Sequence, residues 1–144
     1  MKRLFSIALL LAVCLSGLAQ SGDVSAADGR FGIVEGYHGG VWSTQMRLSM
    51  IDLCSDLGVD SYVYAPKDDP YVGSPHWYLS YSQVRADMLE ELMDLCERNR
   101  MEFTWCIRPD QEFSWTEEDY AFLLGKLEMM HYIGVRSFGI ILDD

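Results

Sequence analysis

The sequence is poor in basic residues and in cysteine. Its 144 residues include 11 Lys and Arg against 22 Asp and Glu, which gives a formal net charge of −11. Because no cluster of basic side chains is present to replace the counterions of a nucleic acid, binding through phosphate contacts is disfavoured. The four cysteines are widely spaced and form no C-x-x-C motif, so neither a disulfide framework nor a metal site is indicated. The composition favours a protein that acts on neutral substrates or cations.

The sequence also lacks an apolar run long enough to span a membrane. Lys2 and Arg3 precede the run LFSIALLLAVCL, which is too short to cross a bilayer, and small residues then lead up to Ala19. This order is typical of a secretory signal peptide. We therefore predict a signal peptide at residues 1–19, a flexible leader at residues 20–30, and export to the periplasm or the extracellular space.

Two of the cysteines that remain after the predicted cleavage lie in helix-like segments. Cys54 and Cys96 each follow an Asp-Leu pair inside an apolar-periodic stretch, where cysteine behaves as a small core hydrophobe. An oxidising compartment permits a disulfide bridge as the alternative.

From residue 31 onward, strand-like and helix-like segments alternate. Short apolar runs begin near residues 31, 61, 101 and 137, and helical patterns separate them. The last helix is predicted to begin after Ser114, with Glu117 completing a capping box. In the first helical segment, 43–58, apolar residues recur on one predicted face: Met46, Met50, Leu53, Cys54 and Leu57.

Strands that alternate with helices of this length are typical of parallel pairing through right-handed crossovers. Two architectures use such units, the open doubly wound sheet and the (β/α)8 barrel. The segment GYHGG after the first strand lacks the G-x-G-x-x-G order of a dinucleotide site. Since a barrel takes ~250 residues, we predict an α/β fold that forms the first half of a (β/α)8 TIM barrel, truncated, with residues 31–144 as a partial catalytic domain.

Polar residues collect where the predicted strands end, which is where parallel α/β folds bind ligands. Each group has an ordinary alternative. The glycines after the first strand fit a tight turn, the aspartates before Pro70 fit turn chemistry, and Lys67 fits an ion pair. His38 fits a polar loop position. The candidates at these ends are Gly36, His38, Lys67, Asp68, Asp69, Asp143 and Asp144.

The adjacent pair Asp143 and Asp144 is harder to explain as surface chemistry. Two neighbouring carboxylates repel each other, and in a partly desolvated cleft the pKa of one of them would rise. That combination supplies a proton donor beside a charged partner, which acid catalysis at an acetal requires. Adjacent residues fit poorly the ~5–5.5 or ~6.5–9.5 Å separation of a two-carboxylate glycosidase. They better fit a substrate-assisted mechanism, in which the 2-acetamido group of the sugar is the nucleophile.

The sequence resembles glycoside hydrolase family 84, the O-GlcNAcase-like β-N-acetylglucosaminidases, some of which were formerly labelled hyaluronidases. Three of its segments occur in the order and spacing of successive blocks of that family: GIVEGYHGGVWSTQMRL, YVYAPKDDP and GVRSFGIILDD. The resemblance runs from about Phe31 to Asp144. It implies a (β/α)8 catalytic barrel and retaining hydrolysis of terminal β-linked N-acetylglucosamine on glycans or glycoproteins. It implies no metal and no organic cofactor.

The resemblance also implies roles for single residues. Asp143 matches the aspartate that orients and polarises the acetamido group. Asp144 matches the general acid for the leaving group, which then acts as general base for water. Gly36 matches the glycine whose backbone carbonyl meets the sugar, and Lys67 matches the lysine that hydrogen-bonds sugar hydroxyls.

Two stretches depart from the family pattern. The usual EGFYGRPW is EGYHGGVW here, so His38 occupies the place of a tyrosine. After the third strand, Arg108, Pro109 and Asp110 replace the common SPG. Both changes lie at the rim of the predicted site and affect the expected affinity for substrate. We keep His38 and, next to the lysine of the second block, Asp68 as further candidate substrate-binding residues.

Two other functions compete with hydrolysis. A half barrel without its later strands fits a catalytically inactive fragment, or a sugar-binding remnant of the same fold. A different class, an acidic cation-binding protein, fits the four aspartates at the strand ends: Asp68, Asp69, Asp143 and Asp144.

Overall fold

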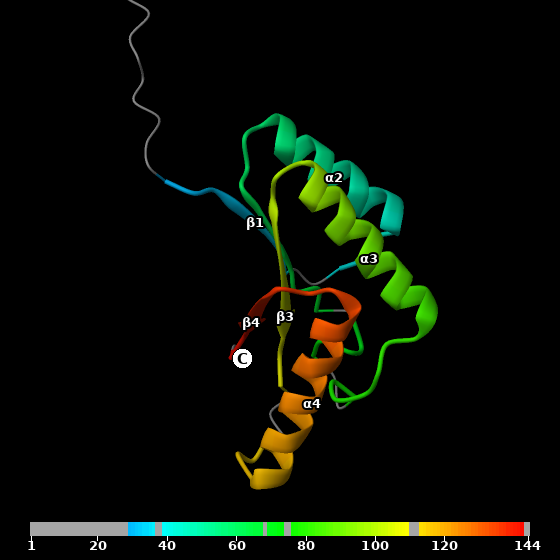
Figure 1. Cartoon of the computed structure of the whole chain (residues 1–144), viewed down its shortest axis with the longest axis vertical. Helices are drawn as coiled ribbons and strands as arrows, with labels where there is room; N and C mark the ends of the chain where they lie inside the picture. The colour runs from blue at the N-terminus through cyan, green and yellow to red at the C-terminus, as the bar shows by residue number, and fades with distance from the viewer. Residues whose placement is uncertain (1–28, 37–38, 68, 74–75, 110–112, 143–144) are drawn as a thin grey trace, which may run out of the picture.

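The computed structural model describes residues 29–36, 39–67, 69–73, 76–109 and 113–142 of the chain. Within them, strands and helices alternate in the predicted order (Figure 1). Among the helices in these ranges, none is long and apolar enough to cross a membrane. The strands are β1 (Gly32–Glu35), β2 (Ser61–Tyr64), β3 (Glu102–Ile107) and β4 (Ser137–Ile140). The helices are α2 (Thr44–Asp56), α3 (Gln83–Arg98) and α4 (Glu117–Ile133).

The four strands form one parallel sheet in the order β1-β2-β3-β4. Gly32 pairs with Ser61, Ser61 pairs with Glu102, and Thr104 pairs with Ser137. Each strand therefore lies beside the strand that precedes it in the chain, and one helix connects the two. This arrangement confirms the predicted α/β class and the parallel pairing of all four strands.

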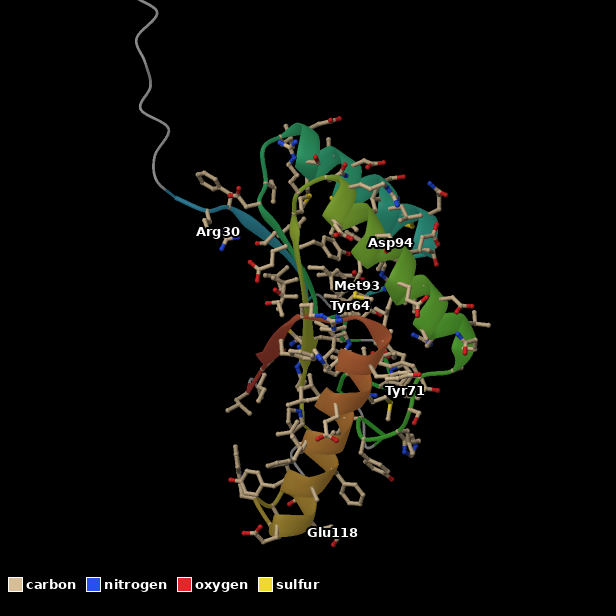
Figure 2. All side chains as sticks on the ribbon, in the orientation of Figure 1. Arg30, Tyr64, Tyr71, Met93, Asp94 and Glu118 are labelled. Atoms are coloured by element: carbon tan, nitrogen blue, oxygen red, sulfur yellow. The ribbon has the colours of Figure 1, made fainter. Side chains whose placement is uncertain are left out.

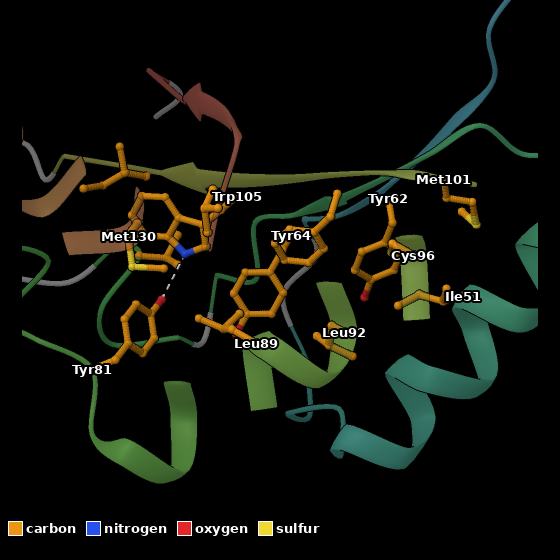
Figure 3. Packing of buried hydrophobic residues seen from close by; sticks show 14 of the residues in the cluster. Ile51, Tyr62, Tyr64, Tyr81, Leu89, Leu92, Cys96, Met101, Trp105 and Met130 are labelled. Atoms are coloured by element: carbon orange, nitrogen blue, oxygen red, sulfur yellow. Dashed lines mark hydrogen bonds between the residues drawn. The ribbon is translucent and has the colours of Figure 1, made fainter. Parts of the chain in front are cut away.

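Aromatic residues of β2 and β3 form the centre of the core. Successive side chains of a strand point to opposite faces, and Tyr62 and Tyr64 are both fully buried on the face that the helices cover. Trp105 lies on the same face, since the register pairs it with Tyr64. The three helices contribute residues that pack against these rings (Figure 3): Ile51, Leu89, Leu92 and Met130.

The opposite face of the sheet carries smaller side chains. Thr104 lies on this face and donates a hydrogen bond from Oγ1 to Ser137 Oγ at 3.0 Å. Gly139 of β4 lies beside Cys106 of β3, and a Cβ atom at Gly139 would come within 2.5 Å of Cys106 Sγ. Glycine at this position therefore allows β3 and β4 to pair while the thiol occupies the face that they share.

The buried side of α2 differs from the prediction. Arg47 and Cys54 are buried, whereas Met46 is 53% exposed and Leu53 is 51% exposed. The predicted stripe was therefore wrong for Met46 and Leu53, and also for Leu57, which is exposed. The reason is that Arg47 binds a buried carboxylate on β1, which fixes the rotation of the helix. Met46 and Leu53 line an apolar groove of about 340 Å³.

The start of α4 also differs from the prediction. Thr116 is the N-cap, and its Oγ1 accepts a hydrogen bond from the N–H of Asp119 at 3.2 Å. The Asp119 carboxylate accepts from the N–H groups of Thr116 and Ser114, each at 3.0 Å. The hydrogen bonds from Thr116 and Ser114 lower the pKa of Asp119. The capping box predicted for Ser114 and Glu117 was therefore wrong, because the carboxylate of Asp119 binds both residues that flank position 115.

The cysteines in the described residues are free thiols in buried positions: Cys54, Cys96 and Cys106. Burial raises the pKa of Cys54 and Cys106 and raises the pKa of Cys96 to about 12. A thiol with a raised pKa is a poor nucleophile at neutral pH. The prediction that Cys54 and Cys96 act as core hydrophobes is confirmed.

Candidate functional site

The carboxyl ends of the four strands meet at one edge of the sheet, as parallel pairing requires (Figure 1). Backbone hydrogen bonds continue the pairing beyond the strands. The N–H of Ala65 donates to the carbonyl of Glu35 at 3.1 Å, and the N–H of Ile141 donates to the carbonyl of Ile107 at 2.9 Å. The segments that follow the strands therefore start side by side along the edge where the sequence predicts a site.

Of the candidates at the strand ends, Gly36, Lys67 and Asp69 lie in the described part of the chain, and two of them, Gly36 and Lys67, were predicted to bind the sugar. Gly36 is half-buried directly after β1, and Lys67 is half-buried three residues after the end of β2. Because β1 and β2 are neighbours, both residues belong to adjacent segments at this edge. The other candidates lie outside the described residues, and their roles stay predictions: His38, Asp68, Asp143 and Asp144.

A buried acid, Glu35, ends β1 immediately before Gly36. Arg47 of α2 donates from Nε to both carboxylate oxygens at 3.0 Å and from Nη2 to Oε1 at 2.7 Å. The hydroxyl of Tyr62 donates to Oε2 at 2.5 Å. Glu35 and Arg47 are only 3% and 5% exposed, so the ion pair lies inside the core. Bidentate pairing of this kind fixes both orientation and distance.

Arg47 also holds the far end of the segment that contains Gly36. Its Nη1 donates to the backbone carbonyl of Trp42 at 2.7 Å. One guanidinium therefore fixes both the residue before Gly36 and Trp42, which lies two residues before the start of α2. We call Glu35, Arg47, Tyr62 and Trp42 the Glu35 cluster.

The ion pair changes the titration of its members. Burial alone would lower the pKa of Arg47, but the hydrogen bonds and charge of Glu35 raise it above its ordinary value. Burial, together with the hydrogen bond to Glu35, raises the pKa of Tyr62. Both groups therefore keep their protons throughout the physiological range of pH.

A second buried acid, Asp69, lies two residues after Lys67. Its Oδ2 accepts hydrogen bonds from the hydroxyls of Tyr64 at 2.8 Å and Tyr81 at 3.0 Å. Its Oδ1 accepts from the backbone N–H of Tyr71 at 2.9 Å. In Figure 2, Tyr64 lies in the sheet and Tyr71 lies in the connection beyond it. Asp69 is 3% exposed, so these donors replace the water that the carboxylate loses on burial.

Two further groups complete the contacts of this acid. Arg85 of α3 places Nη1 3.6 Å from Asp69 Oδ2. The indole Nε1–H of Trp105 donates to the Tyr81 hydroxyl at 3.2 Å, as the dashed line in Figure 3 shows. We call Asp69, Tyr64, Tyr81, Arg85 and Trp105 the Asp69 cluster.

A buried lysine, Lys126 of α4, lies against the Asp69 cluster. Its Nζ donates to the carbonyl of Leu79 at 2.5 Å and lies 4.4 Å from the centroid of the Tyr81 ring. The residue is 1% exposed. Burial lowers the pKa of Lys126 from 10.5 to about 8, and the charge of Asp69 acts in the opposite direction. α4 is thus tied to the connection between β2 and α3.

The sequence interpretation missed most of these groups. Asp69 was assigned to turn chemistry or cation binding; its bond to the N–H of Tyr71 is turn chemistry, but its carboxylate is buried. That burial weakens the cation-binding alternative. In the described residues, no group of three or more His, Cys, Asp or Glu side chains could hold a metal ion. One signal was available: Tyr62 and Tyr64 lie on the buried face of one strand, and buried tyrosine hydroxyls need partners.

Known proteins match this chain along most of its length. The family profile described as beta-N-acetylglucosaminidase matches residues 31–144. Protein O-GlcNAcase of Mus musculus is 31% identical over 134 residues, which cover 90% of this chain and 14% of that protein. The same identity and coverage hold for Protein O-GlcNAcase of Rattus norvegicus. The chain therefore spans about one seventh of the length of these curated relatives.

Solved structures share the fold. The structure described as CpGH84B superposes with a TM-score of 0.75 at 33% identity, covering 80% of this chain and 21% of that chain. A mutant of the O-GlcNAc hydrolase of Thermobaculum terrenum gives a TM-score of 0.75 at 30% identity, covering 80% of this chain and 25% of that chain.

Proposed function

The chain belongs to the β-N-acetylglucosaminidases of glycoside hydrolase family 84, and from this premise we propose that it serves the retaining hydrolysis of terminal β-linked N-acetylglucosamine. The substrate is a glycan or glycoprotein that carries this sugar, and its 2-acetamido group is the nucleophile. In this proposal the four strands and three helices belong to the first half of a (β/α)8 barrel.

One observation carries the proposal. The pairing of β4 with β3 continues through Ile141, whose N–H donates to the carbonyl of Ile107 at 2.9 Å. The carboxylate pair Asp143–Asp144 follows two residues later in the sequence. Gly36 and Lys67 belong to the same edge of the sheet, and sites at this edge are general in (β/α)8 enzymes.

Each candidate residue has a separate task in the proposed reaction. Asp143 accepts the acetamido N–H, so that the carbonyl oxygen of the same group attacks the anomeric carbon. Asp144 donates a proton to the departing oxygen and then takes a proton from the water that opens the oxazoline. The carbonyl of Gly36 and the ammonium of Lys67 bind the sugar, and His38 and Asp68 complete the binding surface.

Turnover of chromogenic β-N-acetylglucosaminides by the purified chain tests this assignment. With a poor leaving group, Asp144→Asn should lower kcat by about 10²- to 10⁴-fold, the range for loss of a general acid. With an activated leaving group the same variant should lose much less, because departure then needs little protonation. Asp143→Asn should lose rate with both substrates. Asp94→Asn, an exposed aspartate on α3 (Figure 2), is the matched control. An unchanged rate for Asp144→Asn would remove Asp144 from the acid role.

A sugar-binding role without turnover is the second candidate. The match to the related structure covers 21% of that chain. Binding of N-acetylglucosamine in an NMR titration, with no product from any glucosaminide, would identify this role.

We also propose that the chain is exported, with residues 1–19 as a signal peptide and 20–30 as a flexible leader. The support is the order of Lys2 and Arg3, a short apolar run, and small residues before Ala19. Mass spectrometry of the mature protein should find an N-terminus at Gln20. A mature protein that retains Met1 would contradict export by this route.

A further inference from the structure

The segment Pro66–Gly73 follows β2 and carries the candidate residue Lys67, and a buried carboxylate lies at its centre. The oxygens of Asp69 accept hydrogen bonds from Tyr64 of β2, from Tyr81, two residues before α3, and from Tyr71 of the segment itself. We infer that Asp69 is a positioning residue, which holds Lys67 for sugar binding and does not itself contact the sugar. The inference rests on the function proposed above.

Burial and existing contacts both restrict access of a ligand to Asp69, which is 3% exposed. Oδ2 accepts two tyrosine hydroxyls and lies 3.6 Å from Arg85, while Oδ1 accepts the N–H of Tyr71. A sugar hydroxyl that displaced one of these donors would leave it buried without an acceptor, which is strongly unfavourable. Asp69 therefore acts on a sugar through the segment that it holds.

Backbone contacts connect Asp69 directly to the position of Lys67. The N–H of Asp69 donates to the carbonyl of Pro66 at 3.3 Å, which closes a turn around Lys67. The carbonyl of Asp69 accepts from the N–H groups of Val72 at 3.0 Å and Gly73 at 3.4 Å. A displacement of Asp69 consequently moves the residues on both sides of it.

The same segment is fixed to the end of β3. The N–H of Arg108 donates to the carbonyl of Val72 at 2.7 Å. A Cβ atom at Gly73 would lie 3.2 Å from Arg108 Nη1, so glycine permits this close approach. The segment thus spans two neighbouring strand ends, and a change in its position alters the edge of the sheet where the sugar is proposed to bind.

Large buried rings set the position of the carboxylate. Tyr64 and Trp105 are fully buried, and Tyr81 is 8% exposed. Trp105 orients the Tyr81 hydroxyl, and Lys126 lies over the Tyr81 ring. Because close-packed interiors transmit displacement, the core of the protein, and not a flexible surface side chain, determines where Asp69 holds the segment.

Two variants test the inference at different strengths. Asp69→Asn replaces the carboxylate. Tyr81→Phe removes one donor to Asp69, together with the acceptor of the Trp105 indole N–H, but leaves the carboxylate in place. Tyr78→Phe is the matched control, since Tyr78 is a 40% exposed tyrosine in the same connection between β2 and α3. Amide hydrogen exchange is followed at residues 71–73 and throughout β3, and affinity for N-acetylglucosamine is measured by NMR titration.

We expect exchange at residues 71–73 to accelerate about tenfold in Asp69→Asn, because the loss of a hydrogen bond to a charged group favours local opening. Exchange in β3 should stay within about twofold of the unaltered chain. The dissociation constant for N-acetylglucosamine should rise by about tenfold, since a displaced Lys67 loses the hydrogen bond of a charged donor to the sugar. Tyr81→Phe should show the same pattern at smaller size, and Tyr78→Phe should match the unaltered chain.

Other outcomes would overturn the inference. Equal acceleration in β3 would mean that Asp69 only stabilises the fold. Faster exchange at 71–73 with unchanged sugar affinity would mean that the segment does not position the site. If Asp69→Asn does not fold, the same two measurements on Tyr81→Phe decide whether the inference holds. If the unaltered chain binds no sugar, the proposed function is contradicted, and exchange at residues 71–73 alone decides whether Asp69 positions the segment.

Discussion

The ends of β1 and β2 are both held by buried acidic side chains, but the two acids are neutralised in different ways. Glu35, just before Gly36, pairs with Arg47 at 2.7 Å, and both side chains are almost completely buried. Asp69, just after Lys67, accepts hydrogen bonds from two hydroxyls and a backbone N–H. Its nearest guanidinium, Arg85, lies at 3.6 Å and has a 36% exposed side chain.

This difference predicts how each end responds to substitution. In the Glu35 cluster one charge compensates another, so the loss of either partner leaves an unbalanced charge in the core. In the Asp69 cluster several weaker donors share one charge, so the loss of a single donor removes only part of the stabilisation. We therefore expect one substitution in the Glu35 cluster to cause a large loss of stability. Single substitutions in the Asp69 cluster should each cause a smaller loss.

The largest expected effect is that of Arg47→Met. Removal of one partner of a buried ion pair lowers the free energy of unfolding by about 3–5 kcal/mol, as urea denaturation would measure. The double variant Glu35→Gln/Arg47→Met should recover a large part of this loss, because it leaves no unbalanced charge. A double variant as unstable as Arg47→Met would show that packing, and not charge, dominates the Glu35 cluster.

The next largest effect is a pH dependence of the free energy of unfolding. It comes from Lys126, which lies against the Asp69 cluster. The pKa of Lys126 is about 8 in the folded chain and 10.5 as the ordinary value. Between these values the unfolded chain binds the proton that the folded chain has released, so the free energy of unfolding rises with pH. Relative to Lys126→Met, the unaltered chain should gain roughly 3 kcal/mol across this window.

The comparison with Lys126→Met is needed because other groups act with the opposite sign. Burial raises the pKa of Tyr62 and Tyr64 and that of Cys96. Their contribution to stability is present at lower pH and is lost as the unfolded chain ionises. These contributions cancel in the difference between the two chains. A difference that falls from pH 8 to pH 10 would contradict the burial of a lysine with a lowered pKa.

A smaller loss is expected for Tyr64→Phe, which removes one of the donors to Asp69. The free energy of unfolding should fall by about 1.5 kcal/mol, the value for a hydrogen bond to a charged group. Tyr132→Phe is the control, because Tyr132 of α4 is 92% exposed and should change nothing in the same denaturation experiment. A loss as large as that of Arg47→Met would erase the distinction between the two clusters.

The smallest effect is expected for an exposed ion pair, which serves as a reference for the buried Glu35–Arg47 pair. Arg30 donates to Glu102 at 3.1 Å, but the two side chains are 74% and 43% exposed. Arg30→Gln should lower the free energy of unfolding by less than about 0.5 kcal/mol. Whatever effect exists should vanish in high salt, which screens exposed charges. A persistent loss would show that exposure does not separate this pair from the Glu35–Arg47 pair.

The fold was predictable because its signals are local. The runs at β2 and β3 have strand composition, and the segments of α2, α3 and α4 have helical spacing, so the alternation and the parallel sheet followed from neighbouring residues. The helix caps and the buried faces of the helices were harder to predict from the sequence. Thr116 was missed as the N-cap because its partner Asp119 competes with the equally plausible Ser114 and Glu117 pair.

The support of the candidate site depends on contacts between distant residues. Arg47 interrupts an apolar stripe, and nothing within α2 indicates that it binds Glu35, twelve positions away in β1. Lys126 resembles a solvated charge among the leucines of α4, yet it contacts Leu79, 47 positions earlier. Local patterns assign charged residues to the surface by default, so charges buried by tertiary contacts are the ones that they misplace.

The strand order has a consequence for assembly during synthesis. Because β2, β3 and β4 each pair with the strand made just before them, the described sheet can grow at one edge as the chain leaves the ribosome. The Glu35 cluster can close once β2 is made, and the Asp69 cluster once Trp105 is made. Of the four described strands β4 docks last, so the proposed catalytic pair emerges onto an edge whose supports are already in place.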